Sequence, residues 1–178
     1  MISRTWLTRY IPGICLVVID PVTQPMKVLH INSYYSTRDF YYNLFEEQVK
    51  QQMAIDVYVP VAFEPKLKLV KNSYTRVVIN HNKFDRLVFH LKHHKILNDV
   101  VKQYDISQFD VLHAHSLFSN GYIAWRLKQQ YSIPYIVAVR SSDVNTFFGK
   151  MLHLRQLGIK ILNDADAVIF LSESYRQL

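Results

Sequence analysis

Two apolar runs of this chain end in polar segments whose side chains could do chemistry. The first run ends in His113-Ala-His115, and the second continues into Arg140-Ser-Ser-Asp143. A histidine can donate or accept a proton near neutral pH, and an arginine can bind a phosphate or carboxylate through two parallel hydrogen bonds. Ligands of open α/β sheets bind where the carboxyl ends of neighbouring strands meet. We therefore expect a binding crevice between these two segments.

Each segment also has a structural interpretation. His113 and His115 alternate along one strand and could face the same side, but a metal ion would need at least a third ligand, so we predict no metal site. One histidine then serves as a structural hydrogen-bonding group, and His115, nearer the strand end, is the better candidate for the crevice. Asp143 could instead cap the next segment through its side-chain oxygens or pair with Arg140.

Short apolar runs alternate with stretches of helical periodicity along the chain. The predicted strands cover residues 27–31, 55–61, 110–114, 135–139 and 167–171, and residues 74–79 form a strand or the arm of a hairpin. The predicted helices cover residues 40–53, 84–104, 121–131, 147–157 and 172–178. One apolar stripe runs along 84–104, and Gly158 is expected to end the fourth helix. Strands that alternate with helices pair in parallel through right-handed crossovers. The predicted fold class is therefore α/β, a Rossmann-like, doubly wound parallel sheet.

Composition and absent motifs narrow the classes of function. With 49% hydrophobic residues, 4 Gly and 6 Pro, the 178 residues fit a packed domain rather than a disordered or turn-rich all-β chain. The lone Cys15 fits a reducing compartment, and no apolar run is long enough to span a membrane. The sequence has no G-x-G-x-x-G after the first strand, no P-loop and no G-x-S-x-G, which argues against a dinucleotide on that turn, a P-loop nucleotide site and a serine hydrolase elbow.

The net charge of +7 is concentrated in one region of the chain. Its cationic residues are Lys66, Lys68, Lys71, Arg76, Lys83, Arg86, Lys92 and Lys95. Such a patch attracts phosphate in nucleotides, nucleic acids or anionic lipid head groups, although a solvated helix face would explain it equally well. Because no helix-turn-helix, zinc or aromatic sheet signature accompanies the patch, we do not expect nucleic-acid binding.

The first 25 residues differ from those that follow. Their apolar stretch is interrupted by Pro12 and Gly13 and lacks a small-residue cleavage site, so it resembles a signal peptide only loosely. We interpret residues 1–25 as an N-terminal extension, disordered or produced by the choice of start codon. Residues 26–178 form the predicted domain, which we expect to be truncated at its C-terminal end.

Four segments in this order resemble the N-terminal, acceptor-side domain of a GT-B glycosyltransferase of family 4. The opening run from Met26 to Asn32 fits the same pattern, and the resemblance covers about residues 26–178. The four segments are Asp110-Val-Leu-His-Ala-His115, Ser119-Asn-Gly-Tyr122, Ala138-Val-Arg-Ser-Ser-Asp143 and Ala165-Asp-Ala-Val-Ile-Phe-Leu-Ser172. Two departures are Ser141, where the family usually has Gly, and the loop after the first strand, which lacks the Gly pair that many members carry.

The resemblance implies a retaining enzyme with two Rossmann-like domains and its active site between them, without a metal or cofactor. The N-terminal domain mainly holds a saccharide or lipid-linked acceptor, and the C-terminal domain, with its E-x7-E signature, holds the nucleotide-sugar donor. His115 is the implied catalytic residue, which orients the transferred sugar or stabilises charge as the diphosphate leaves. The implied substrate-binding residues are Arg140, Asp143, Ser33, Tyr34, Asn120 and Gly121.

These expectations give a hexosyl transfer to a cell-surface polysaccharide or glycolipid, in the cytoplasm or peripherally on the inner membrane face. The chain alone is expected to be inactive because half of the cleft is missing from these residues. The alternative is a non-catalytic α/β module that binds a small phosphorylated ligand or a protein partner in the same crevice.

Overall fold

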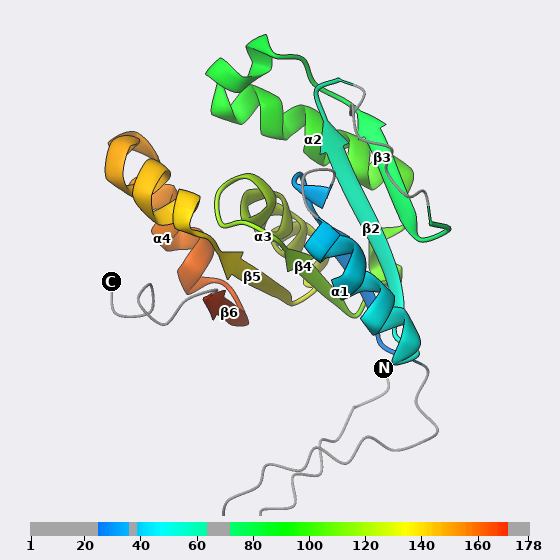
Figure 1. The fold of residues 1–178 in the computed structure, drawn as a ribbon. Helices are drawn as coiled ribbons and strands as arrows, with labels where there is room; N and C mark the ends of the chain where they lie inside the picture. Colours follow the sequence, from blue (N-terminus) through cyan, green and yellow to red (C-terminus); the bar gives the residue numbers. More distant parts are fainter. Residues whose placement is uncertain (1–24, 36–38, 64–71, 171–178) are drawn as a thin grey trace, which may run out of the picture.

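The computed structural model describes residues 25–35, 39–63 and 72–170 of the chain. Within these ranges six parallel strands form one sheet in the order β3-β2-β1-β4-β5-β6 (Figure 1). The strands are β1 (Lys27–Ile31), β2 (Ala54–Val61), β3 (Thr75–Ile79), β4 (Val111–Ala114), β5 (Tyr135–Val139) and β6 (Ala167–Phe170). The order runs outward from β1 in both directions, which confirms the predicted Rossmann-like, doubly wound α/β fold.

The helices cover the two faces of the sheet unequally. They are α1 (Asp39–Lys50), α2 (Phe89–Gln103), α3 (Ser119–Tyr131) and α4 (Arg155–Asn163). On one face α1 packs Tyr41 and Phe45 against Val28 of β1, whereas α2, α3 and α4 share the opposite core with Leu29. Successive residues of β1 thus point to opposite faces, and both faces of this strand are buried. In the described part of the chain, no helix is both long and apolar enough to cross a membrane.

The helix predicted over residues 84–104 is broken at Val88. Val88 has extended backbone angles (φ −117°, ψ 98°), so a 3₁₀ turn, η2 (Phe84–Leu87), precedes α2. The predicted apolar stripe is wrong in its first half, because Phe84, Val88 and Leu91 are exposed. The buried residues of α2 are instead His93, Ile96 and Val100, which lie on one face of the helix.

The helix predicted over residues 147–157 is also wrong in its bounds. Residues 143–148 form a π-helical segment, η4 (Asp143–Phe148), and a 3₁₀ turn, η5 (Leu152–Leu154), leads into α4. Gly158 lies inside α4 rather than after a helix end. A Cβ atom at this position would lie 2.7 Å from Cζ of Phe118 and 2.8 Å from Cζ of Phe148, so the glycine serves close packing. The helix predicted over 172–178 and residues 1–24 of the predicted extension lie outside the described residues.

Candidate functional site

The predicted site residues come from three loops at the carboxyl ends of β1, β4 and β5, which are neighbours in the sheet. The loop after β1 carries Ser33 and Tyr34, the segment from the end of β4 into α3 carries His115, Asn120 and Gly121, and the segment after β5 carries Arg140 and Asp143. Direct contacts join each pair of neighbouring loops, so the structure brings the seven residues together at one edge of the sheet.

The loop after β1 is held by two asparagines. The side-chain oxygen of Asn32 accepts a hydrogen bond from the Tyr34 amide at 2.9 Å, which closes a tight turn. The side-chain oxygen of Asn120, at the start of α3, accepts from the Ser33 hydroxyl at 2.7 Å and from the Ser33 amide at 3.3 Å. Asn32 and Asn120 are both fully buried, and their Nδ2 donors have no hydrogen-bond acceptor among the described residues.

The side chain of Arg140 packs against the same loop, over the ring of Tyr34. Its guanidinium carbon lies 4.0 Å from the centre of the Tyr34 ring, a cation–π distance. Its Nη1 atom is buried and has no acceptor in the part of the chain that the structure describes. An arginine held in this way keeps a fixed fork of donors ready for an oxygen-rich ligand.

Asp143 is buried, and its carboxylate accepts hydrogen bonds from backbone amides. It accepts hydrogen bonds from the amides of Leu117 at 3.1 Å and Arg140 at 3.0 Å, and a longer one from Phe118 at 3.5 Å. Burial raises the pKa of Asp143, while its hydrogen bonds with these amides oppose that rise. The residue therefore ties the loop before α3 to the segment after β5, in the manner of a capping side chain.

Gly121 allows α3 to approach the sheet closely. Its amide donates to the Ser116 carbonyl at 2.8 Å. A Cβ atom at Gly121 would lie 3.2 Å from each of three atoms, in Ile161, Ser116 and Val137. The glycine therefore sets how near the first turn of α3, and with it Asn120, lies to the carboxyl ends of the strands.

His115 is almost fully buried beside two other histidines. Its Nε2 atom lies 3.0 Å from Nδ1 of His30, and its ring stacks on that of His113 at a centroid distance of 4.2 Å. Burial lowers the pKa of all three, to about 4 for His113. The positive charge of Arg140 lowers the pKa of His115 further, so His115 is neutral near pH 7 and lies within electrostatic reach of Arg140.

Sequence reasoning did not identify His30 as part of this group. The signal was its position in the first predicted strand, because parallel pairing puts His30 in register with His113. Side chains of paired residues on adjacent strands lie on the same face of a sheet, so the pairing brings a third imidazole to the two already noted.

The three histidines lie close enough to raise the question of a metal ion. One nitrogen from each ring can be chosen so that all lie within 4.8 Å of one another. However, imidazole lone pairs lie in the ring plane, and the stacked rings of His113 and His115 are only 25° from parallel. Their planes therefore do not meet near the rings, and the two lone pairs do not converge on one ion in this arrangement.

Comparison with known proteins agrees with these observations. Residues 40–178 match the family described as Glycosyltransferase Family 4. The fold resembles that of sucrose-phosphate synthase from Thermosynechococcus elongatus, with a TM-score of 0.60 and 16% identity over 85% of this chain and 79% of the other. At this identity the likeness concerns the fold alone. The sequence has no match among curated proteins.

Proposed function

Because this chain belongs to glycosyltransferase family 4, we propose that the site at the carboxyl ends of β1, β4 and β5 is the acceptor side of a retaining glycosyltransferase. Members of this family act on a nucleotide-sugar donor and an acceptor. The proposed reaction transfers a hexosyl group to a cell-surface polysaccharide or glycolipid. In the two-domain GT-B arrangement the nucleotide-sugar is held mainly by a second domain, so we expect these 178 residues not to complete the transfer alone.

The observation that supports this proposal best is a group of buried donors without acceptors. The Nδ2 atoms of Asn32 and Asn120 and the Nη1 atom of Arg140 are buried and unpaired within the described residues. A buried polar group without a partner costs about 1–3 kcal/mol. Of the three residues, only Arg140 is partly exposed, so its guanidinium is the group best placed to meet a ligand rich in acceptor oxygens, such as a sugar or a diphosphate, while the two asparagine donors are covered.

The roles follow from the charges. His115 is neutral, so it would contribute by orienting the transferred sugar through a hydrogen bond rather than by carrying charge. Arg140 carries a positive charge near His115 and would stabilise the negative charge that develops on the leaving diphosphate. Asp143 and Gly121 would act through the backbone by fixing the loops that carry these groups.

The test joins the chain to the donor-binding domain of a family 4 enzyme and screens nucleotide-sugars for nucleotide release. We expect turnover from the fusion and none from the chain alone. His115→Ala should lower kcat/KM by at least about tenfold, which corresponds to the loss of one hydrogen bond to the sugar. Unchanged kcat/KM in His115→Ala would remove His115 from the proposed role.

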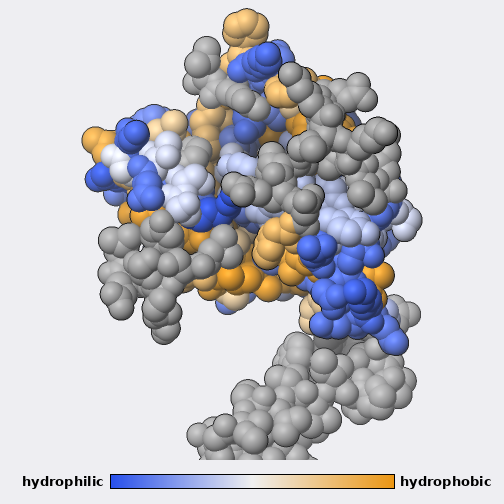
Figure 2. Space-filling model, viewed as in Figure 1, coloured by the Kyte–Doolittle hydropathy of each residue, from blue (hydrophilic) through white to orange (hydrophobic). Residues whose placement is uncertain are grey.

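An exposed apolar surface beyond the carboxyl ends of β2 and β3 supports a membrane-associated acceptor. We call this surface the η2 patch; it consists of Phe63, Phe84, Val88 and Leu91. Phe84 is 80% exposed, and the Lys83 ammonium lies 5.5 Å from the centre of the Phe63 ring. Hydrophobic and hydrophilic surfaces adjoin at this end of the molecule, at the top of Figure 2.

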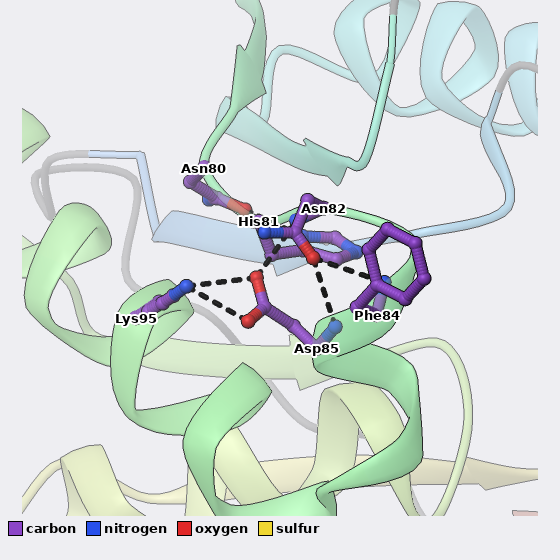
Figure 3. Close-up of polar contacts among 6 residues, drawn as sticks. All are labelled: Asn80, His81, Asn82, Phe84, Asp85 and Lys95. Atoms are coloured by element: carbon purple, nitrogen blue, oxygen red, sulfur yellow. Dashed lines mark hydrogen bonds and ion pairs between the residues drawn. The ribbon is translucent and has the colours of Figure 1, made fainter.

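The turn that carries Phe84 is held firmly despite its exposure. The side-chain oxygen of Asn82 accepts hydrogen bonds from the amides of Phe84 and Asp85, each at 2.9 Å, and the Asp85 carboxylate accepts from the Asn82 amide at 2.8 Å (Figure 3). Lys95 binds both oxygens of the same carboxylate, at 2.8 and 2.9 Å. The polar contacts thus fix an apolar side chain in an outward position.

We propose that the η2 patch contacts an anionic membrane surface, on the cytoplasmic face, and that a lipid-linked acceptor binds at the same, carboxyl end of the sheet. Exposed aromatic and aliphatic side chains enter the interface between head groups and acyl chains, and nearby cations add electrostatic attraction. Several basic residues of the patch predicted from the sequence are engaged elsewhere or cannot be placed, so fewer of them are available to attract lipid head groups. Lys95 is paired with Asp85, Arg76 donates to the Gln103 carbonyl, and Lys66, Lys68 and Lys71 lie outside the described residues.

A further inference from the structure

An exposed aromatic ring lies one side chain away from His115. Tyr41 of α1 is buried, and its ring meets that of His115 at nearly a right angle, with 5.4 Å between the ring centres. The ring of Phe40, the residue before it, packs against Tyr41 at the same centre distance, and Phe40 is 61% exposed. A line of three rings thus leads from the buried imidazole to the surface of the molecule.

The topology of the sheet explains why Phe40 lies beside the candidate site. The helix α1 connects β1 to β2, which pairs in parallel with β1, so the helix begins at the carboxyl end of the sheet (Figure 1). Phe40 belongs to the first turn of this helix, which follows the loop that carries Ser33 and Tyr34. Its ring is therefore exposed at the end of the sheet where ligands of such folds bind.

Packing of the core does not account for Phe40. The side chains of α1 that pack in the core are Tyr41, Leu44 and Phe45, and Phe40 is not one of them. A single exposed apolar side chain is common and means little alone. Phe40 differs because of its contact with Tyr41 beside the site and because exposed Asn43, three residues on, lies on the same side of the helix. An apolar ring and an amide group therefore adjoin each other at the surface.

A pyranose ring matches this pair of groups. One face of many pyranoses carries C–H groups, which are attracted to the electron-rich face of an aromatic ring, and the edge carries hydroxyl groups that an amide binds as donor and acceptor. A bilayer surface matches less well. Membrane insertion uses several adjoining apolar side chains, as in the η2 patch, whereas Phe40 adjoins the exposed amide of Asn43.

We propose that Phe40 and Asn43 form a subsite for a sugar unit of the acceptor. The inference rests on the proposed function, in which His115 orients the transferred sugar. Only the Tyr41 ring separates His115 from Phe40, so the subsite is within reach of the sugar next to the transferred one. The acceptor then already carries a sugar. The reaction extends a glycan that an earlier glycosyl transfer began, instead of placing a first sugar on a lipid phosphate.

Saturation-transfer NMR of the full chain tests the subsite, with the methyl pyranosides of glucose, galactose and mannose as probes. We expect saturation of the aromatic protons of the protein to reach the C–H protons of at least one probe. Phe40→Leu, which keeps an apolar side chain but no ring, should weaken binding of that probe about two- to tenfold, whereas Phe40→Trp should retain it. Phe170→Leu is the matched control, because Phe170 is 38% exposed and lies on β6, at the edge of the sheet.

Absence of saturation transfer from the wild-type chain to every probe would overturn the proposal, as would equal affinities of Phe40→Leu and Phe170→Leu. Unchanged pyranoside binding by Phe40→Leu with weaker binding to phosphatidylglycerol-containing vesicles would make Phe40 a membrane contact and would also overturn it. The fusion enzyme separates this inference from the proposed function. No transfer to any acceptor, with pyranoside binding intact, contradicts the function alone, whereas transfer to a polyprenyl phosphate but to no glycoside contradicts the subsite alone.

Discussion

The guanidinium group of Arg140 lies over the ring of Tyr34, with 4.0 Å between the guanidinium carbon and the ring centre. These residues follow β5 and β1, which flank β4 and its His115 in the sheet. The contact therefore joins the two outer loops of the site beside the central one. Stacking on an aromatic ring fixes the plane of a guanidinium group, and with it the direction of its donors.

Arg140→Lys tests whether this orientation matters. The lysine keeps the positive charge but cannot stack as a plane or donate two parallel hydrogen bonds, so we expect kcat/KM of the fusion enzyme to fall about 10- to 100-fold. Arg155→Lys is the matched control. Arg155 is exposed, is not one of the candidate site residues, and donates a hydrogen bond of 2.6 Å to the Phe148 carbonyl. Equal effects of the two substitutions would contradict a specific role for Arg140.

Asp143→Ala should destabilise the chain strongly. The substitution leaves the amides of Leu117, Phe118 and Arg140 without their common acceptor, and we expect the free energy of unfolding to fall by about 2–4 kcal/mol. Asp105→Ala is the control, because exposed Asp105 accepts from the Ser107 amide in a similar way and its loss should cost only about 1 kcal/mol. Urea unfolding at pH 7 measures both, and similar losses would argue against a locking role for Asp143.

Acid should destabilise the fold through its buried histidines. Burial lowers the pKa of His113 from 6.5 to about 4, so the unfolded chain binds a proton at this residue as the pH falls below 6.5 while the folded chain does not. Stability contributed by neutral His113 is therefore present above pH 6.5 and lost as the pH falls toward 4. At the limiting slope of about 1.4 kcal/mol per pH unit, this loss reaches about 2 kcal/mol at pH 5.

Urea unfolding at pH 7, 6 and 5 measures this slope. The glutamine of His113→Gln cannot take up a proton in either the folded or the unfolded state. Between pH 7 and pH 5 the free energy of unfolding of this variant should therefore fall by about 2 kcal/mol less than that of the wild-type chain. His153→Gln, at an exposed histidine, is the control for the loss of an imidazole. A wild-type chain equally stable at pH 7 and pH 5 would contradict the burial of neutral histidines.

The fold could be predicted because its signals are local. Apolar runs such as 27–31 and 135–139 gave strands with the observed bounds, and their alternation with helices required parallel pairing. The break at Val88 could not be predicted in this way, because the residues of η2 and α2 continue one helical period across it. What separates them is a set of side-chain contacts with Asn82, Asp85 and Lys95, and periodicity does not report such contacts.

The meeting of the candidate site residues at one end of the sheet was predictable, but their contacts with one another were not. Polar residues at strand ends identified His115 and Arg140, since strand ends in such a sheet gather at one edge. Two contacts join segments more than 20 residues apart in the sequence. They are the hydrogen bond from the Leu117 amide to Asp143 and the contact between His30 and His115. A single sequence specifies those contacts only through the packed structure.

Phe84→Ser tests the η2 patch. If the patch enters the interface of an anionic bilayer, the loss of one largely exposed aromatic ring should weaken binding to phosphatidylglycerol-containing vesicles by about tenfold or more. Leu152→Ser is the matched control, because Leu152 is 61% exposed and lies outside the patch. Vesicle sedimentation at low and high salt measures both variants, and binding independent of salt and anionic lipid would count against the proposal.

Two glycines near the junction of η4, η5 and α4 should respond in opposite directions to the same substitution. A Cβ atom at Gly158 would lie 2.7 Å from Cζ of Phe118, which is fully buried and cannot move aside. Gly158→Ala should therefore destabilise the chain by about 1–3 kcal/mol, in spite of the higher helix propensity of alanine. At Gly149 the nearest atom to such a Cβ is the Val144 carbonyl oxygen at 3.7 Å, an ordinary contact, and the backbone there is helical.

Gly149→Ala should accordingly stabilise the chain by about 0.5–1 kcal/mol, because alanine reduces the freedom of the unfolded chain without creating a clash. The sign of the difference is informative because both residues are glycines in helical backbone and differ mainly in the space around them. Urea unfolding midpoints of the two variants measure it. If Gly158→Ala were as stable as Gly149→Ala, α4 would not pack against Phe118 as closely as the structure has it.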